Sequence, residues 1–164
     1  MFDVFVHARD MDSFFAVPMP SVSQFDILDM PPGLWRHIYL IEVGQDGALC
    51  VRQYGSAIHD AFKRPLKGMD LRDFVHGAHS RDVLALYDDV QRTGQAFAVQ
   101  QTVYLVEQTC IVRVECAMRP LWDGGRVARI LGCLFVDREI DVNLLSGTSP
   151  PTKIHIELPD FPEG

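Results

Sequence analysis

The chain has 164 residues, 48% of them hydrophobic, which suits one ordinary domain with a single core. Its 22 Asp and Glu residues outnumber its 15 Lys and Arg residues and give a net charge of -7, and no Lys/Arg cluster offsets this charge. Because such a chain is repelled by phosphate backbones and anionic lipids, we expect neither nucleic acid nor a membrane surface as a partner.

The first part of the chain, residues 1–36, predicts a helical or irregular extension. Pro18, Pro20, Pro31 and Pro32 break any long helix in this part. The opening string MFDVFVHARDMD places acidic residues among apolar ones and contains no long apolar run, unlike a secretory signal or a membrane span. We therefore expect a cytoplasmic protein.

The regular region, residues 37–137, begins with a predicted hairpin followed by helices. Ile38–Val43 and Leu49–Tyr54 are apolar runs on either side of the turn string GQDG. Ser56–Phe62 predicts a short helix, and Ser80–Thr93 a longer one that ends before a glycine. In the longer helix the apolar side chains recur at i, i+3, i+4 and i+7, so one stripe faces a core: Val83, Leu86, Tyr87 and Val90.

Three strands complete the regular region. Phe97–Val106 is followed by Cys110–Met118, in which apolar and partly charged faces alternate. Val127–Val136 follows the turn string WDGG and is apolar on both faces, which is typical of a central strand. Together the elements predict an α+β fold with a five-stranded antiparallel sheet. The remaining residues, 138–164, predict a flexible tail because they are rich in Pro, Gly and Ser.

The chain order of two strands, short helices, a long helix and three antiparallel strands resembles that of a PAS domain. The strings PSVSQFDILDMPPGLWRHIYLIEV, RQYGSAI, FKRPLKG and RILGCL resemble, over about residues 20–137, a bacterial family of small stand-alone PAS proteins. Arg52 and Gly55 match an Arg that stands three residues before a Gly in that family, and Gly68 matches a second Gly. Lys63 and Pro65 depart from the pattern, because the family has a Gly and an acidic or polar residue there.

This resemblance implies helices packed on one face of the sheet, with a small pocket between them and the inner sheet face. Haem and flavin are among the cofactors of the wider family, and the sequence names none for this chain. The expected pocket residues lie on the apolar strand face and on the helices opposite it: Ile41, His59, Phe62, Val83, Tyr87, Val112, Val114, Cys116 and Leu134. A filled core would need the same residues, and periodicity does not distinguish a cavity from close packing.

Few residues in the chain point to a particular chemistry. Arg52 either fixes the second strand through an ion pair, which we favour, or binds an anionic ligand. His59 could reach the pocket, although a lone His is more often structural, and we interpret His76 and His79 as a surface pair rather than a metal site. We interpret the cysteines as reduced, buried residues without a redox or metal role: Cys50, Cys110, Cys116 and Cys133.

The absence of catalytic motifs favours a protein that is not an enzyme. The chain lacks a G-x-S-x-G string, a phosphate-binding loop and the Asn-Cys-Arg string of light-sensing PAS relatives. The resemblance implies a sensory or interaction domain that acts through an unidentified signalling protein. We expect a homodimer formed through the apolar residues Phe14, Phe15 and Val17. The alternatives are a small α+β cone enzyme of the polyketide-cyclase-like kind, with an Asp and a His as its acid/base pair, and a ligand-free scaffold.

Overall fold

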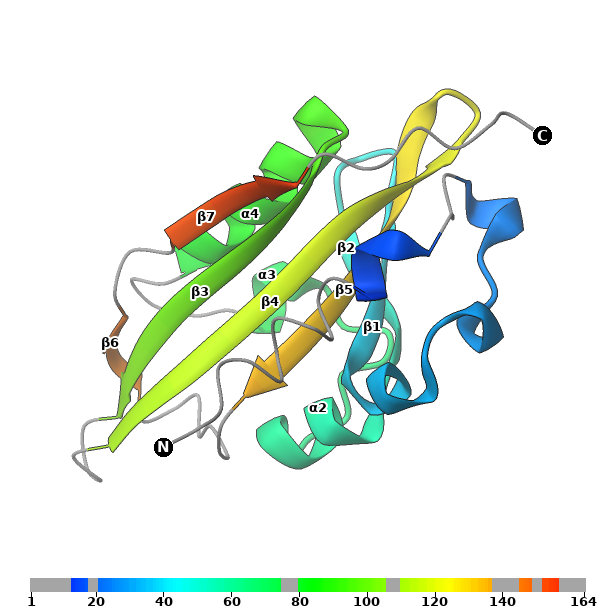
Figure 1. Cartoon of the computed structure of the whole chain (residues 1–164). Coiled ribbons are helices and arrows are strands. Elements are labelled where there is room, and N and C mark those ends of the chain that lie inside the picture. The colour runs from blue at the N-terminus through cyan, green and yellow to red at the C-terminus, as the bar shows by residue number, and fades with distance from the viewer. Residues whose placement is uncertain are drawn as a thin grey trace.

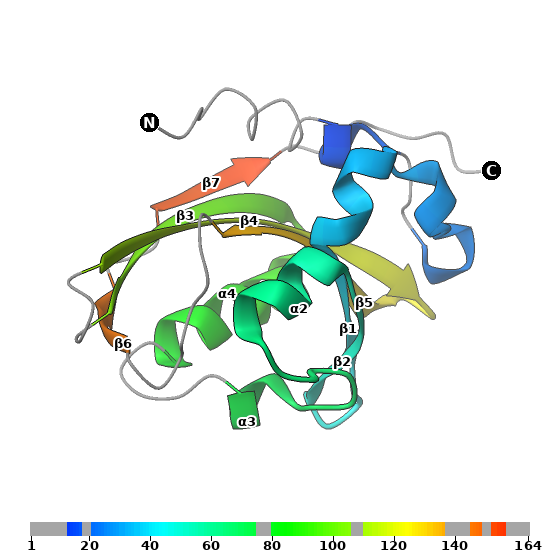
Figure 2. The same ribbon diagram turned by 90° about the horizontal axis from the view of Figure 1, so that it is seen from below.

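The computed structural model describes residues 13–17, 21–74, 80–105, 110–136, 145–148 and 152–156. Its centre is an antiparallel sheet in the order β2-β1-β5-β4-β3, formed by β1 (Ile38–Val43), β2 (Leu49–Tyr54), β3 (Ala96–Leu105), β4 (Cys110–Asp123) and β5 (Arg126–Val136). The α-helices between β2 and β3 cover one face of this sheet (Figures 1 and 2): α2 (Ser56–Phe62), α3 (Leu71–Phe74) and α4 (Ser80–Thr93). The predicted α+β fold is confirmed, with an antiparallel sheet and with these α-helices packed on one of its faces.

Two short strands from the C-terminal part extend the sheet beyond β3. β6 (Leu145–Thr148) and β7 (Thr152–Ile156) both pair antiparallel with β3 (Figure 1). The prediction of a flexible tail over residues 138–164 is therefore wrong for these two segments. The free N–H and C=O groups of an edge strand can pair with another extended segment, and this long-range effect is not visible in local Pro and Gly content.

β4 is longer than predicted at its C-terminal end. The alternation predicts a strand over Cys110–Met118, with a loop after Pro120. In the structure β4 continues to Asp123, and Pro120 lies opposite Ile130 of β5. Pairing with β5 thus continues β4 beyond the proline.

The inner sheet face and the helices enclose one group of buried side chains, which we call the inner core. Leu86, Tyr87 and Val90 of α4 belong to it, as the helical stripe predicted. Cys116 and Met118 of β4 also lie in it, whereas Ala117 faces the other side, so the predicted alternation is confirmed there. The remaining members come from β1, β2, β3, β5 and the short helices: Tyr39, Ile41, Val43, Leu49, Val51, Ile58, Leu66, Leu71, Phe97, Val99, Val127 and Ile130.

The outer sheet face is covered by the N-terminal part of the same chain (Figure 2). This cover consists of residues 13–17 and three short 3-10 helices, η1 (Val22–Gln24), η2 (Ile27–Asp29) and η3 (Pro32–His37). Its apolar side chains and those of the sheet form the outer core: Phe14, Phe15, Met30, Leu34, Ile38, Leu40, Ala96, Ala117, Leu121, Leu131, Cys133 and Phe135. β5 is buried on both faces, as predicted, because it contributes to both cores.

The aromatic side chains at the N-terminus are not an exposed apolar stretch. Phe14 is 0% exposed and Phe15 is 7% exposed, because both pack against the sheet of their own chain. The sequence reasoning assumed that the sheet would leave them uncovered, and this assumption is wrong. A homodimer that used these two side chains would first have to detach them from the outer core.

Arg119 connects the N-terminal segment to the sheet through hydrogen bonds. This residue of β4 is 1% exposed, and its Nη1 group donates to the carbonyl oxygens of Phe14 at 3.1 Å and Val17 at 2.7 Å. Burial lowers the pKa of the guanidinium to about 10, so the side chain is still cationic at neutral pH. The alternation places Arg119 on the partly charged face of the strand, and the structure buries it under residues 13–17.

Lys63 ends helix α2 in a conformation that favours glycine. Its backbone has φ 50° and ψ 30°, in the left-handed region, and its N–H group donates to the carbonyl of His59 at 2.7 Å. This is the position where the resembling family has a Gly. We expect Lys63→Gly to unfold at higher urea concentration than Lys63→Ala, with a difference of about 1 kcal/mol, because only Ala keeps the strain. Both variants lose the Lys side chain, so equal stability would contradict this assignment.

Candidate functional site

Three polar side chains form a hydrogen-bonded row inside the inner core. Tyr87 of α4 donates its hydroxyl to the hydroxyl of Tyr39 at 3.1 Å, and the Tyr39 hydroxyl lies 3.1 Å from Sγ of Cys116 on β4. Because the Tyr39 oxygen already accepts from Tyr87, its own proton is available to donate to the sulfur. We call Tyr87, Tyr39 and Cys116 the polar row, which connects the long helix to two strands of the sheet.

Burial keeps the polar row neutral. It raises the pKa of the Cys116 thiol to about 12 and moves the pKa values of Tyr39 and Tyr87 well above the ordinary range of a phenol. A protonated thiol is a poor nucleophile and a poor metal ligand. The row therefore offers neutral hydrogen-bonding groups in an apolar surrounding, which suits binding rather than covalent catalysis.

The cysteine thiols are expected to differ in reactivity. Cys116 and Cys133 are buried, whereas Cys50 is only half-buried, which departs from the prediction that all cysteines are buried. At mildly alkaline pH, iodoacetamide should modify Cys50 first in the folded protein and should reach Cys116 and Cys133 only in urea. Peptide mass spectrometry measures each site. Modification of Cys116 as fast as Cys50 would contradict the buried polar row.

The same raised pKa gives the protein a pH dependence. The folded thiol of Cys116 titrates at about 12, above the ordinary value of 9.0. Between these pH values the unfolded state releases the proton and the folded state keeps it, so stability falls as pH rises.

Most of the predicted pocket residues do gather at the inner core. Ile41, Tyr87 and Cys116 belong to it, and the partly buried side chains of Phe62, Val83 and Leu134 pack against it. The side chains of Val112 and Val114, and the residues His76 and His79, lie outside the described part of the chain.

His59 does not reach the inner core. Its side chain is exposed on α2 and its ring stacks on Tyr54, with 6.3 Å between the ring centroids. The neighbouring residue Ile58 faces the core, and a helix turns by about 100° per residue, so His59 points away. The pocket role predicted for His59 is wrong for this reason.

The ion pair that we favoured for Arg52 is present. Its Nε atom lies 2.8 Å from Oε2 of Glu42 on the neighbouring strand β1, and both side chains are about half exposed to solvent. Exposed pairs of this kind stabilise a fold by less than about 1 kcal/mol. Because the ion pair contributes so little stability, the second interpretation of Arg52, as an anion-binding group, stays a prediction.

Arg52 lines a cavity of about 470 Å³ that sequence reasoning did not find, and we call it the edge cavity. It lies where the 3-10 helices, the start of β1, the end of β2 and the loop after α2 meet. Its lining residues are Phe25, Ile27, Trp35, Ile38, Tyr39, Leu40, Arg52, Gln53, Tyr54, Gly55 and Lys67. Because these residues come from four separate segments, only Arg52 gave a hint of this site in the sequence.

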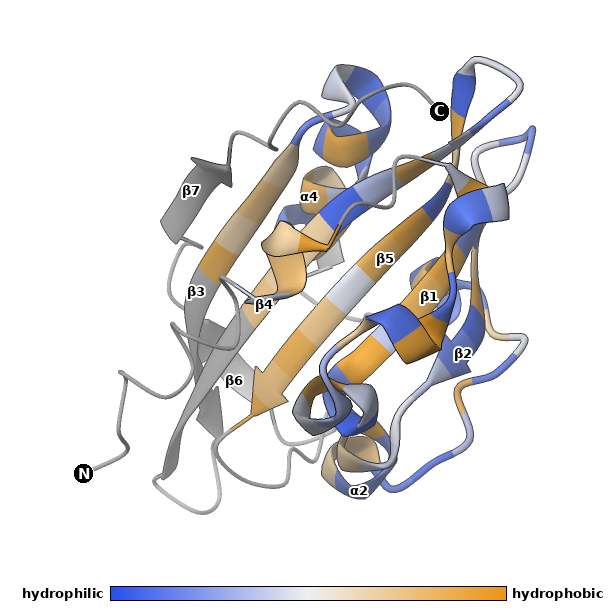
Figure 3. Cartoon of the chain, turned by 45° about the vertical axis from the view of Figure 1, so that its right-hand side comes forward, coloured by the Kyte–Doolittle hydropathy of each residue, from blue (hydrophilic) through white to orange (hydrophobic). Residues whose placement is uncertain are grey.

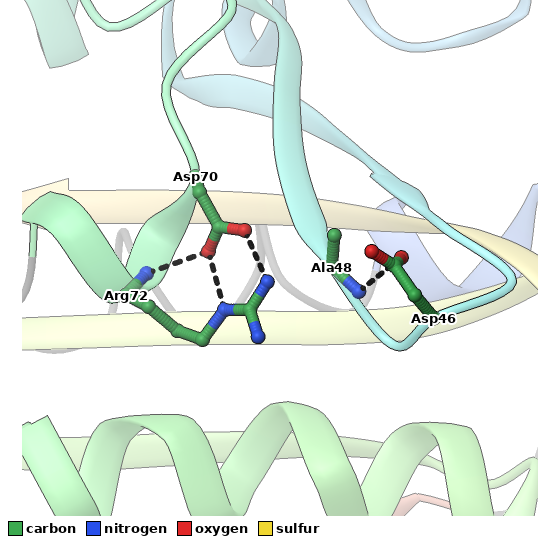
Figure 4. Close-up of polar contacts among 4 residues, drawn as sticks. All are labelled: Asp46, Ala48, Asp70 and Arg72. Carbon is green, nitrogen blue, oxygen red and sulfur yellow. Dashed lines mark hydrogen bonds and ion pairs between the residues drawn. The ribbon is translucent and has the colours of Figure 1, made fainter.

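Other polar contacts hold turns in place (Figure 4). Asp70 accepts hydrogen bonds from the backbone N–H of Arg72 at 2.9 Å and from its guanidinium at 3.0 and 2.6 Å, which lowers the pKa of the Asp70 carboxyl. Asp46 accepts from the backbone N–H of Ala48 at 3.1 Å in the β1–β2 turn. Among the described residues, no group of three or more His, Cys, Asp or Glu side chains could hold a metal ion.

Comparison with known proteins finds likeness only among solved structures, and it is distant. No family model matches the chain, and no curated protein does. A solved structure described as a fungal LOV domain photoreceptor is 15% identical, with a TM-score of 0.45, and the match covers 82% of this chain and 91% of that one. No helix in the described residues is long and apolar enough to span a membrane.

Proposed function

We propose that this chain is a PAS-type sensory domain that holds a small ligand between the inner sheet face and the helices and acts on a partner protein. The observation that carries this proposal is the polar row. Small-molecule sites are mostly apolar, with a few polar groups that orient the ligand, and the inner core combines these properties. A place in the bacterial stand-alone family and a cytoplasmic location belong to the same proposal.

The polar row also suggests how binding would be transmitted. A ligand that hydrogen-bonds Tyr87 would compete with the Tyr87–Tyr39 contact, which connects α4 to β1. A ligand shifts a conformational equilibrium only if it interacts differently with the two states. Exchange of this hydrogen bond provides such a difference, and movement of α4 is the expected response.

The test is native mass spectrometry, with an absorbance spectrum, of freshly purified protein. We expect a bound small molecule in the wild-type protein and about tenfold weaker retention in Tyr87→Phe, because one buried hydrogen bond is lost. Thr93→Val is the control, since its hydroxyl donates to the carbonyl of Asp89 on the exposed side of α4, outside the polar row. A protein that carries no ligand would favour the ligand-free scaffold, and equal retention by both variants would show that the polar row does not hold the ligand.

The described structure does not support the enzyme alternative. A polyketide-cyclase-like enzyme would need an acid/base pair beside its pocket. Among the side chains whose burial the structure describes, Arg119 is the only buried charged one, and it lies under residues 13–17 on the outer face of the sheet. The polar row supports the sensor, which is the function that we propose.

A further inference from the structure

We propose that the edge cavity, whose lining shares Tyr39 with the inner core, binds an organic anion with an apolar body. The lining is mainly aromatic and aliphatic, and it includes Trp35 and Ile27, which are 37% and 38% exposed. Burial of such partly exposed apolar side chains by a ligand is favourable. A volume of about 470 Å³ falls within the usual range of small-molecule sites.

The charges around the edge cavity select an anion. Lys67 and Arg52 line it, and no Asp or Glu does, although the chain has 22 acidic residues. Within the described residues Lys67 makes no ion pair. Arg52 uses Nε to contact Glu42, which leaves its two Nη groups for a ligand. A guanidinium and an ammonium together suit a carboxylate, because both donate charge-assisted hydrogen bonds.

The walls of the edge cavity are held in position before any ligand binds. Trp35 donates its indole N–H to the carbonyl of Met30 at 2.9 Å, which fixes one aromatic wall. Tyr54 accepts from the N–H of Leu66 at 3.1 Å and thereby holds the loop that carries Lys67 against β2. Figure 3 shows the hydrophilic residues of β2 beside the apolar strand β1, the same mixture that lines the cavity.

Gly55 lets the backbone approach closely at the edge cavity. A Cβ atom at this position would overlap the carbonyl groups of Trp35 and Arg36, so η3 and the end of β2 meet backbone to backbone. This contact holds η3 against the end of β2, so that Trp35 and Arg52 line the same cavity. Fixed walls reduce the entropy that a ligand must overcome on binding.

Phenylbutanoate is a suitable probe, because it joins a carboxylate to an aromatic body. The chain has two Trp residues, so in Trp122→Phe the remaining fluorescence reports on Trp35. We expect saturable quenching by phenylbutanoate and at least about tenfold weaker binding of phenylbutanol, which lacks the charge. Butanoate, which lacks the aromatic body, should also bind weakly. Absence of binding, or equal binding of the alcohol, would overturn the proposal.

Charge variants then locate the site. In the Trp122→Phe background, Lys67→Gln and Arg52→Gln should each weaken phenylbutanoate binding about tenfold. Arg92→Gln removes an exposed charge on α4, far from the cavity lining, and should leave affinity unchanged.

Glu42→Gln breaks the ion pair but keeps Arg52, so binding should be equal or tighter. If Glu42→Gln and Arg52→Gln weaken binding alike, Arg52 is only structural and the proposal fails. Tyr87 does not line the edge cavity, so Tyr87→Phe should weaken phenylbutanoate binding much less than Arg52→Gln does, which distinguishes this cavity from the polar row.

Discussion

Gly132→Ala is expected to lower the free energy of unfolding by about 3 kcal/mol, because the added methyl group has no space in the packed inner core. A Cβ atom at position 132 of β5 would overlap the ring of Tyr39 at Cζ, Cε1 and Oη. The ring cannot easily move, because its hydroxyl is held by Tyr87 and Cys116. Urea denaturation measures the loss.

A double-mutant cycle tests the cause of this loss. Tyr39→Leu removes the ring that the new methyl group meets, so Gly132→Ala should cost about 2 kcal/mol less in that background than in the wild type. Strict additivity of the two substitutions would show that the glycine is needed for another reason. The cycle also probes the polar row, because any substitution that displaces Tyr39 breaks both of its hydrogen bonds.

Phe14→Ala is expected to lower the free energy of unfolding by about 3 kcal/mol, through lost burial and the cavity left in the outer core. The side chain is fully buried and contacts the ring of Phe15, with 5.1 Å between their centroids. Leu28→Ala is the matched control, because this side chain is 69% exposed and should change stability by less than about 0.5 kcal/mol. Thermal and urea unfolding of both variants check this.

The same prediction has a second measurement, which concerns the N-terminal segment alone. If Phe14 and Arg119 hold residues 13–17 on the sheet, hydrogen exchange in this segment should speed up in Phe14→Ala and in Arg119→Met. Exchange at β5 should be affected less. Unchanged exchange in the segment would mean that other contacts hold it. The predicted decrease of about 3 kcal/mol in the free energy of unfolding of Phe14→Ala would then be an overestimate.

Local patterns in the sequence were sufficient for the hairpin and the helices. Strands β1 and β2 and helices α2 and α4 have the predicted bounds, because turn residues and helical periodicity act within a few residues. The alternation in β4 correctly divided Cys116 from Ala117. The apolar residues of both faces of β5 likewise indicated its central place in the sheet.

The candidate sites required contacts between distant parts of the chain. Tyr39 lies 77 positions before Cys116, and Phe14 lies 105 before Arg119, so no local pattern could predict either hydrogen bond. His59 was predicted to reach the pocket because it lies on the same short helix as Phe62. Its side chain points away from the core, and that direction depends on how the helix packs on the sheet. The edge cavity was missed because four segments form it.

The sequence by itself therefore determined the elements, their order and which face of each is apolar, since these depend on short-range periodicity and turn chemistry. Only the tertiary structure decided what covers the two faces of the sheet. The helices bury the polar row on the inner face, and the chain's own N-terminal segment closes the outer face with a buried arginine. Tertiary packing also made the last short segments strands, because β3 offered them an unpaired edge.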